Sequence, residues 1–508
     1  MPTRLITFAI ALLCTLSYQA QDTRPNILVI MADDLGFADI GCFGAEIQTP
    51  NLDALASNGL RLTQFYNTAK CHSSRVSLLT GLYANQAGQE SLSRGITTAQ
   101  VLRNAGYFTA MTGKWHLKEE PTDHGFQRYW GHLSGACNFF LGDNTFRLNG
   151  EKWIVPRNQG FYTTTANADW AINFIDEAKT KDKPMYLYMA FNAPHYPLHC
   201  LEEDYRIYED TYKPGWDAIR KARQAKQKQL NLFGKDYLTP APRADHVVAW
   251  DTLTAEEKDW ESQRMAAYAA MIHRLDIEIG RVIDHLRDSK MLDNTLVLFV
   301  SDNGACPFDR TKGRGLPLRP WDPKSYWCYS PGWAHVGNTP FRLYKQNQHE
   351  GGITSPAIVH WPKGLKAKPG SITDQPAHLI DVMATVIELG ETSYPEKDRQ
   401  GKLEPLQGKS LVPILKGEAR EPHDALYFNF DVNRAIRVGD MKLVSFRSSP
   451  WELYDLSEDR TELNNLADEQ PETVRALSDS WHHWAQHVNW LTEKKRRPVK
   501  DTMQKPNF

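Results

Sequence analysis

Short apolar runs recur along the chain, and each one ends in polar residues. Four such runs occur, at residues 26–32, 107–113, 185–191 and 296–300. The polar residues that follow them are Asp33 and Asp34, Lys114 and His116, His195, and Asp302 and Asn303. A continuous apolar run of this length is typical of a strand that is buried on both faces, as in a parallel sheet.

Segments with helical periodicity lie between these runs. They include residues 97–106, 165–179 and the long stretch 265–288. Strands that alternate with helices predict an α/β fold with a doubly wound, mostly parallel sheet. Ligands bind beyond the carboxyl ends of the strands in such sheets, so the polar residues at the four strand ends are expected to form one composite site.

Two regions break this alternation. Residues 201–260 are charged and rich in proline near their end, which predicts an insertion over the face that carries the site. Residues 422–508 contain strand-like alternation followed by a helical segment at 471–488. They predict a small C-terminal subdomain with an antiparallel sheet, after a catalytic α/β domain at 24–421.

The N-terminus has the features of a secretory signal peptide. Arg4 precedes an apolar stretch from Leu5 to Leu16, and small and polar residues lead to Ala20. The stretch is shorter than the roughly 20 residues that span a bilayer, which predicts a signal peptide at residues 1–20. We therefore expect a periplasmic or secreted protein with no membrane span.

Charge narrows the choice of partners. The 508 residues include 59 Lys and Arg against 61 Asp and Glu. No overall basic field is present to attract nucleic acid, so we expect no nucleic-acid partner, and any anion must be held by a local cluster.

The segment CHSSRVSLLTG, residues 71–81, carries the most specific chemical signal. It predicts a helix with Ser73 or Ser74 as N-cap and Cys71 at its N-terminus. Free backbone N–H groups and the helix dipole favour anions there, and Arg75 adds a fixed positive charge. An unmodified Cys71 is expected to have a lowered pKa.

This segment resembles the sulfatase signature, in which a cysteine followed by x-Pro-Ser-Arg and a Leu-Thr-Gly tail is oxidised to formylglycine. Ser73 stands where the family usually has proline. Further similarities follow in the family's order, and they are Asp33–Gly36, Gly113–His116, Asn192–His195, Ser301–Gly304, and Lys345 ahead of Glu350–Gly352. The resemblance covers nearly the whole mature chain. It implies an alkaline-phosphatase-like fold and maturation by a formylglycine-converting enzyme.

The resemblance also implies roles for individual residues. Residue 71, Asp33, Asp34, Asp302 and Asn303 would bind Ca²⁺, for which a set rich in oxygen is suited. The hydrated aldehyde of residue 71 would supply the nucleophilic oxygen, with Asp302 as its proton acceptor. The sulfate oxygens would be neutralised by the metal, Arg75, Lys114 and Lys345. His195, together with Lys345, would protonate the leaving alcohol, and His116 would take the last hydroxyl proton so that the sulfated hemiacetal collapses.

The predicted activity is hydrolysis of carbohydrate sulfates by an exported sulfatase. Segments 129–150 and 212–227 resemble bacterial carbohydrate sulfatases, and a galactose 3-sulfate on glycans is the candidate substrate. Two alternatives remain. An inactive sulfatase-like protein that binds glycans would result if Ser73 prevents conversion of Cys71. A phosphoesterase of the related fold would use Ser or Thr as nucleophile and two zinc ions.

Overall fold

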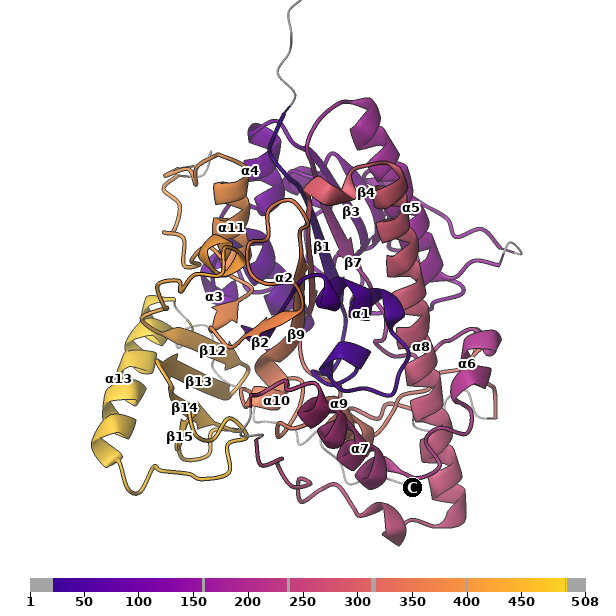
Figure 1. Ribbon diagram of the computed structural model, residues 1–508, viewed down its shortest axis with the longest axis vertical. Helices are drawn as coiled ribbons and strands as arrows, with labels where there is room; N and C mark the ends of the chain where they lie inside the picture. The colour runs from indigo at the N-terminus through magenta and orange to yellow at the C-terminus, as the bar shows by residue number, and fades with distance from the viewer. Residues whose placement is uncertain are drawn as a thin grey trace, which may run out of the picture.

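A large mixed sheet runs through the centre of the computed structural model, which describes residues 22–157, 160–234, 238–311, 317–397, 401–488 and 490 (Figure 1). The predicted signal peptide lies outside these residues. The strands follow the order β10 (Ser371–Thr373), β2 (Leu60–Tyr66), β9 (Thr354–His360), β8 (Thr295–Ser301), β1 (Asn26–Ala32), β7 (Met185–Ala190), β3 (Phe108–Lys114), β4 (Arg128–His132), β5 (Phe146–Leu148) and β6 (Glu151–Lys152), and β11 (Ala377–His378) also pairs with β2.

The four predicted strands are neighbours at the centre of this sheet. Strand β1 lies parallel between β7 and β8, with Met31 opposite both Ala190 and Val300, and β3 lies parallel to β7. The carboxyl ends of β8, β1, β7 and β3 therefore meet at one edge. The predicted α/β fold with a mostly parallel sheet is confirmed. The exception at the centre is β9, which runs antiparallel to both β8 and β2.

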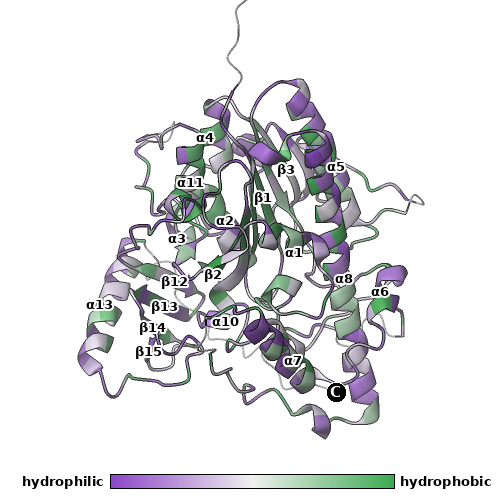
Figure 2. Cartoon of the chain, in the orientation of Figure 1, coloured by the Kyte–Doolittle hydropathy of each residue, from purple (hydrophilic) through white to green (hydrophobic). Residues whose placement is uncertain are grey.

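Strand β1 is buried on both faces because its side chains alternate between two cores. Leu28 and Ile30 pack with residues of α5 (Thr163–Thr180) and α8 (Ala255–Asp288), whereas Ile27 and Val29 pack with residues of α2 (Cys71–Thr80), α4 (Thr98–Asn104) and α11 (Asp381–Leu389). Figure 2 shows the apolar central strands enclosed by helices that are polar on their outer sides. Burial of this kind contributes about 25 cal/mol per Å² of apolar surface.

A second, four-stranded antiparallel sheet lies beside the first (Figure 1). Its elements are β12 (Leu426–Phe430), β13 (Asn433–Val438), β14 (Met441–Ser445), β15 (Glu452–Asp455) and α13 (Pro471–His487). This arrangement confirms the predicted antiparallel sheet and closing helix. Its core includes Tyr66 of β2 and Ile353, so the small sheet is packed against the large one.

The charged insertion at 201–260 supports the loop that follows β1. It contains α6 (Glu202–Tyr208), α7 (Trp216–Gln229) and a 3-10 turn (Trp250–Thr252). The buried Arg223 on α7 donates to Asp39 at 2.6 Å and to Glu46 at 2.8 Å, and Arg220 donates to backbone carbonyls at 241 and 340. A buried cation needs such partners, and those at residues 39, 46 and 340 fix the insertion to the loop after β1 and to the segment that follows α9 (Pro331–Gly337).

The remaining short elements are η1 (Gly41–Phe43), α1 (Pro50–Ser57), α3 (Ala84–Ala87), η2 (Pro121–His124), η4 (Leu292–Asn294), α9 (Pro331–Gly337), α10 (Glu350–Ile353) and α12 (Val412–Leu415). None of the helices in the described ranges combines the length and apolar character that a membrane span requires.

Candidate active site

Helix α2 begins at Cys71 and directs its N-terminus at the ends of the central strands. Lys70 is the N-cap residue, and its side chain makes no capping hydrogen bond, so the prediction of a serine N-cap is wrong. Both serines have other partners. The Ser74 hydroxyl donates to the Asp302 carbonyl at 2.6 Å, and the Ser73 hydroxyl donates to the Lys70 carbonyl at 3.0 Å. Ser74 therefore ties α2 to the end of β8.

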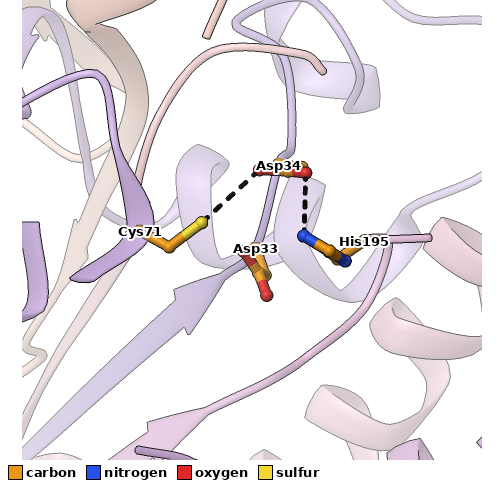
Figure 3. A group of neighbouring side chains, drawn as sticks. All are labelled: Asp33, Asp34, Cys71 and His195. Carbon is orange, nitrogen blue, oxygen red and sulfur yellow. Dashed lines mark hydrogen bonds and ion pairs between the residues drawn. The ribbon is translucent and has the colours of Figure 1, made fainter. Parts of the chain in front are cut away.

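Cys71 belongs to a buried cluster in which Asp34 lies between Cys71 and His195 (Figure 3). One ligand atom from each of Asp33, Asp34, Cys71 and His195 lies within 4.8 Å of the others. The Cys71 Sγ is 3.0 Å from the Lys345 Nζ and 3.9 Å from an oxygen of Asp34. Burial raises the pKa of Cys71 by more than Lys114 and Lys345 lower it. The expected lowering of its pKa is therefore wrong, because desolvation outweighs the nearby positive charges.

Each buried carboxylate around Cys71 faces a cation. Lys345 pairs with Asp34, Lys114 pairs with Asp33, and an Arg75 nitrogen lies 3.0 Å from Asp302. Burial alone would raise the pKa of Asp33, but Lys114, His195 and Arg75 hold it well below its ordinary value. The pKa of Asp34 is lowered in the same way, chiefly by Lys345 against burial. Both groups are therefore ionised at neutral pH.

Asp302 and Asn303 join the cluster from the end of β8. The Asp34 N–H donates to an Asp302 oxygen at 3.2 Å, and the Asn303 amide donates to Asp34 at 2.7 Å. Burial and the neighbouring Asp33 raise the pKa of Asp302 to about 7, although Arg75 opposes them. The residues predicted from two distant strand ends thus lie in one site.

The oxygens of this cluster suit a hard divalent cation. The Asp33 Oδ1, Asp34 Oδ2 and Asn303 Oδ1 atoms are buried and have no hydrogen-bond partner. Three such oxygens gathered in one buried acidic cluster point to an ion or a ligand. Carboxylate and amide oxygens are the ligands that Ca²⁺ prefers, so the residues present fit that ion.

The two predicted histidines occupy different positions. His195 has one ring nitrogen 2.6 Å from the Tyr196 carbonyl and the other 3.5 Å from Asp34, a geometry that suits a protonated ring. Burial nevertheless lowers its pKa to about 4, against the effect of Asp34 and Asp33. His116 packs edge-to-face on His72, with ring centroids 5.8 Å apart, and burial and Lys114 lower its pKa well below the ordinary value.

The backbone around the site is locally strained. Four non-glycine residues in or near the site have left-handed φ angles: Asp34 at 67°, Ala69 at 58°, His116 at 57° and Gln346 at 73°. Such conformations cost about 1–3 kcal/mol each and persist where the surrounding structure enforces them. Close packing adds a further constraint at Gly113, where a Cβ atom would lie 2.0 Å from the Ala190 carbonyl oxygen.

Two residues beside Cys71 were not predicted as site residues. The Lys70 ammonium lies 5.9 Å from the ring centroid of Phe430, at the end of β12. Lys70 directly precedes the Cys71 motif, and this adjacency was an available signal. Nothing in the local sequence of Phe430 indicates the site, because the packing of the C-terminal sheet brings it there.

Comparison with known proteins identifies the family. A family model described as Sulfatase matches residues 25–392, which is more than half of the chain. The chain belongs to the sulfatase family. It is therefore a sulfuric ester hydrolase. A second family model, described as N-sulphoglucosamine sulphohydrolase, C-terminal, matches residues 341–483 of this sulfatase.

Similar proteins extend over nearly the whole sulfatase. An uncharacterized sulfatase of Schizosaccharomyces pombe is 33% identical, over 91% of this chain and 94% of its own. The N-acetylglucosamine-6-O-sulfatase of Bacteroides thetaiotaomicron is 28% identical, over 92% of this chain and 88% of its own. The crystal structure of Ps i-CgsB in complex with k-i-k-neocarrahexaose has a TM-score of 0.68 at 24% identity and covers 95% of this chain and 100% of its own. The structural similarity supports the alkaline-phosphatase-like fold.

Proposed function

We propose that this sulfatase is an exported, calcium-dependent enzyme that hydrolyses sulfate esters of carbohydrates after Cys71 has been oxidised to formylglycine. The observation that carries this proposal is the buried cluster of Asp33, Asp34, Cys71 and His195 at the N-terminus of α2. Three cations surround it, as an anionic substrate requires.

Several features of Cys71 support its conversion. As a thiol it is a poor nucleophile here, because burial raises its pKa. The Cys71 sulfur lies 3.0 Å from the Lys345 ammonium, and we expect the oxygens of a hydrated formylglycine to lie near the same position. Ser73 replaces the usual proline, but the first turn of α2 is still held by the hydrogen bond from Ser73 to Lys70. We therefore expect a converting enzyme to accept this motif.

Calcium fits the oxygens of the cluster that accept no hydrogen bond. Asp33, Asp34 and Asn303 each present a buried oxygen that has no hydrogen-bond partner, and Asp302 and residue 71 complete the proposed set. When bound, the ion would supply positive charge that polarises the sulfate group and favours the ionised form of the attacking hydroxyl. These side chains offer mainly oxygen ligands, whereas a set made only of nitrogen and sulfur ligands would favour zinc.

The remaining residues would bind the sulfate group and move protons. Arg75, Lys114 and Lys345 provide fixed positive charge where the sulfate oxygens develop negative charge. Asp302, whose pKa is raised to about 7, is suited to accept the proton of the attacking hydroxyl. His195 would donate a proton to the leaving oxygen, because an entering sulfate favours its charged form. His116 would accept the proton whose loss regenerates the aldehyde.

A sugar is the proposed carrier of the sulfate. The similar protein of Bacteroides thetaiotaomicron is named for a 6-O-sulfated amino sugar, and the structural neighbour Ps i-CgsB was crystallised with a neocarrahexaose. Export through the predicted signal peptide at residues 1–20 would give access to such glycans. A galactose 3-sulfate on glycans remains the candidate substrate.

The proposal is tested by mass spectrometry of the peptide that contains residue 71. The full chain is expressed with a formylglycine-converting enzyme, the fraction converted is measured, and sulfate release is assayed with 4-nitrophenyl sulfate and a panel of sulfated monosaccharides. The matched control is Cys71→Ala, which cannot be converted. Bound metal is determined by inductively coupled plasma mass spectrometry.

Three results support the proposal: formylglycine at position 71, bound calcium, and release of sulfate from at least one sugar. If the fully converted, calcium-loaded enzyme releases sulfate from none of the sugars, the carbohydrate assignment is refuted. Release at the same rate by Cys71→Ala would refute the role of formylglycine. Bound zinc in place of calcium would refute the metal assignment.

A further inference from the structure

We propose that Lys70 and Phe430 form a second recognition position beside residue 71, which binds another negatively charged group of the substrate. This inference rests on the proposed function and narrows its substrate class to sugars that carry a second anionic group near the sulfate ester that is cleaved. The anionic group is a carboxylate or a second sulfate.

The first observation is that Lys70, unlike the other cations of the site, has no carboxylate partner among the described residues. The three cations already assigned to the site are each paired with a carboxylate, namely Lys114 with Asp33, Lys345 with Asp34 and Arg75 with Asp302. Lys70 forms no ion pair with any of the described residues, and its ammonium group lies over the face of the Phe430 ring, 5.9 Å from the ring centroid. Lys70 is partly exposed and has no carboxylate partner among the described residues, so its ammonium group is available to an anionic ligand.

Exposure gives the second observation. Cys71, Arg75 and Lys114 are fully buried, whereas Lys70, His72 and Phe430 are each partly exposed. Phe430 and His72 also contact each other, with ring centroids 6.0 Å apart. These residues therefore lie on the solvent side of the nucleophile, where the part of the substrate that is not the sulfate must be held.

The position is rigidly built from three distant segments. The Gln346 N–H donates to the Ala69 carbonyl at 2.7 Å, and the Asn433 amide donates to the Gln346 carbonyl at 2.8 Å. The Asn433 side chain in turn accepts from the Arg447 N–H at 2.7 Å. These bonds hold the β12–β13 turn, and with it Phe430, against the segment that carries Lys70. A preorganised position of this kind loses little entropy when a ligand binds.

The chemistry of the pair suits an acidic sugar. The Lys70 ammonium offers up to three donors to carboxylate or sulfate oxygens. The partly exposed Phe430 ring provides an apolar face on which the C–H face of a pyranose can pack. Hydrogen bonds to charged groups contribute about 1.5–3 kcal/mol, which corresponds to about 10- to 100-fold in kcat/KM between doubly and singly charged substrates.

The test compares Lys70→Met with wild type on three classes of substrate: a monosulfated monosaccharide, a disulfated monosaccharide, and a monosulfated disaccharide that contains a uronic acid. The readout is the ratio of kcat/KM for each doubly charged substrate to that for the monosulfated sugar. Rates are normalised to the formylglycine content of each preparation, because Lys70 adjoins the converted residue. Two variants are the matched controls. Lys70→Arg keeps the charge at this position, and Lys409→Met removes a partly exposed lysine elsewhere in the protein.

We expect Lys70→Met to lower that ratio by about 10- to 100-fold and Lys70→Arg to retain most of it. The substrate with the larger loss identifies the second group as sulfate or carboxylate. An unchanged ratio, even with a general loss of activity, would overturn the proposal, since damage to the fold lowers both rates alike.

A binding measurement separates this inference from the proposed function. The dissociation constant of the disulfated sugar is measured by calorimetry on Cys71→Ala, with and without Lys70→Met. A 10- to 100-fold weaker affinity in the double variant supports the Lys70 position even if wild type releases no sulfate. Equal affinities would refute the Lys70 position while sulfate release by wild type still supports the proposed function.

Discussion

Replacing Lys442 with methionine removes the central cation of a buried cluster that joins the C-terminal sheet to α10, beside the large sheet. The Lys442 ammonium lies 2.9 Å from Glu350, at the start of α10, and 2.7 Å from Glu462. All three side chains are fully buried. Glu350 lies five residues beyond Lys345, so this cluster also supports the segment that reaches the active site.

The magnitude follows from what the two carboxylates retain. In the variant, Glu350 keeps Arg460 at 3.3 Å and the Tyr66 hydroxyl at 3.1 Å, whereas the Glu462 oxygen that faced Lys442 has no other partner among the described residues. Removal of one member of a buried ion pair costs about 3–5 kcal/mol, because an uncompensated charge stays in a medium of low polarity. We expect the free energy of unfolding to fall by this amount.

Urea titration followed by tryptophan fluorescence measures the effect, since Trp481 and Trp484 lie in the core of the C-terminal sheet. The matched control is Lys409→Met. Lys409 pairs at 3.3 Å with Glu421, which is 83% exposed, so its loss should cost less than about 1 kcal/mol. Equal effects of Lys442→Met and Lys409→Met would refute the reasoning, as would a failure of added Glu350→Gln and Glu462→Gln substitutions to restore stability.

Four further changes have defined outcomes. Arg75→Met should lower kcat on 4-nitrophenyl sulfate by about 10²–10³-fold with the fold intact by circular dichroism, and a loss under 10-fold would contradict its role in charge stabilisation. Saturating Ca²⁺, at about 100 times its Kd, should stabilise wild type by about 2.7 kcal/mol in thermal unfolding, and Asp34→Asn should remove most of this shift. Gly113→Ala should destabilise the protein in urea titration, because its Cβ would lie 2.0 Å from the Ala190 carbonyl oxygen; an unchanged midpoint would show that β3 and β7 can separate. Burial would raise the pKa of Glu350, but Lys442 and Arg460 outweigh burial and lower this pKa to about 2. The contribution of Glu350 to the free energy of unfolding is therefore present above pH 4.5 and is lost as the pH falls from 4.5 to 2. Glu350→Gln should flatten that part of the stability profile, and an identical acid profile would exclude Glu350 as its source.

The sequence alone predicted the centre of the fold and the residues that the structure brings together at the strand ends. Apolar runs such as 26–32 can only be buried on both faces, and parallel neighbours with helices on either side satisfy that requirement. Once those strands are parallel and adjacent, Asp33, His195 and Asp302 must lie at one edge. The signature at 71–81 added the family and the chemistry.

Tertiary structure decided the features that depend on partners far along the chain. Strand β9 (Thr354–His360) includes Pro356, and only its pairing with β8 and β2 fixes its antiparallel direction. The serine hydroxyls of α2 bond to buried carbonyls rather than cap the helix, and desolvation raises the pKa of Cys71 despite its place at a helix N-terminus. Phe430 reaches the site because the C-terminal sheet packs on β2. Burial and long-range contact set these properties, and neither can be read from residues that are neighbours in sequence.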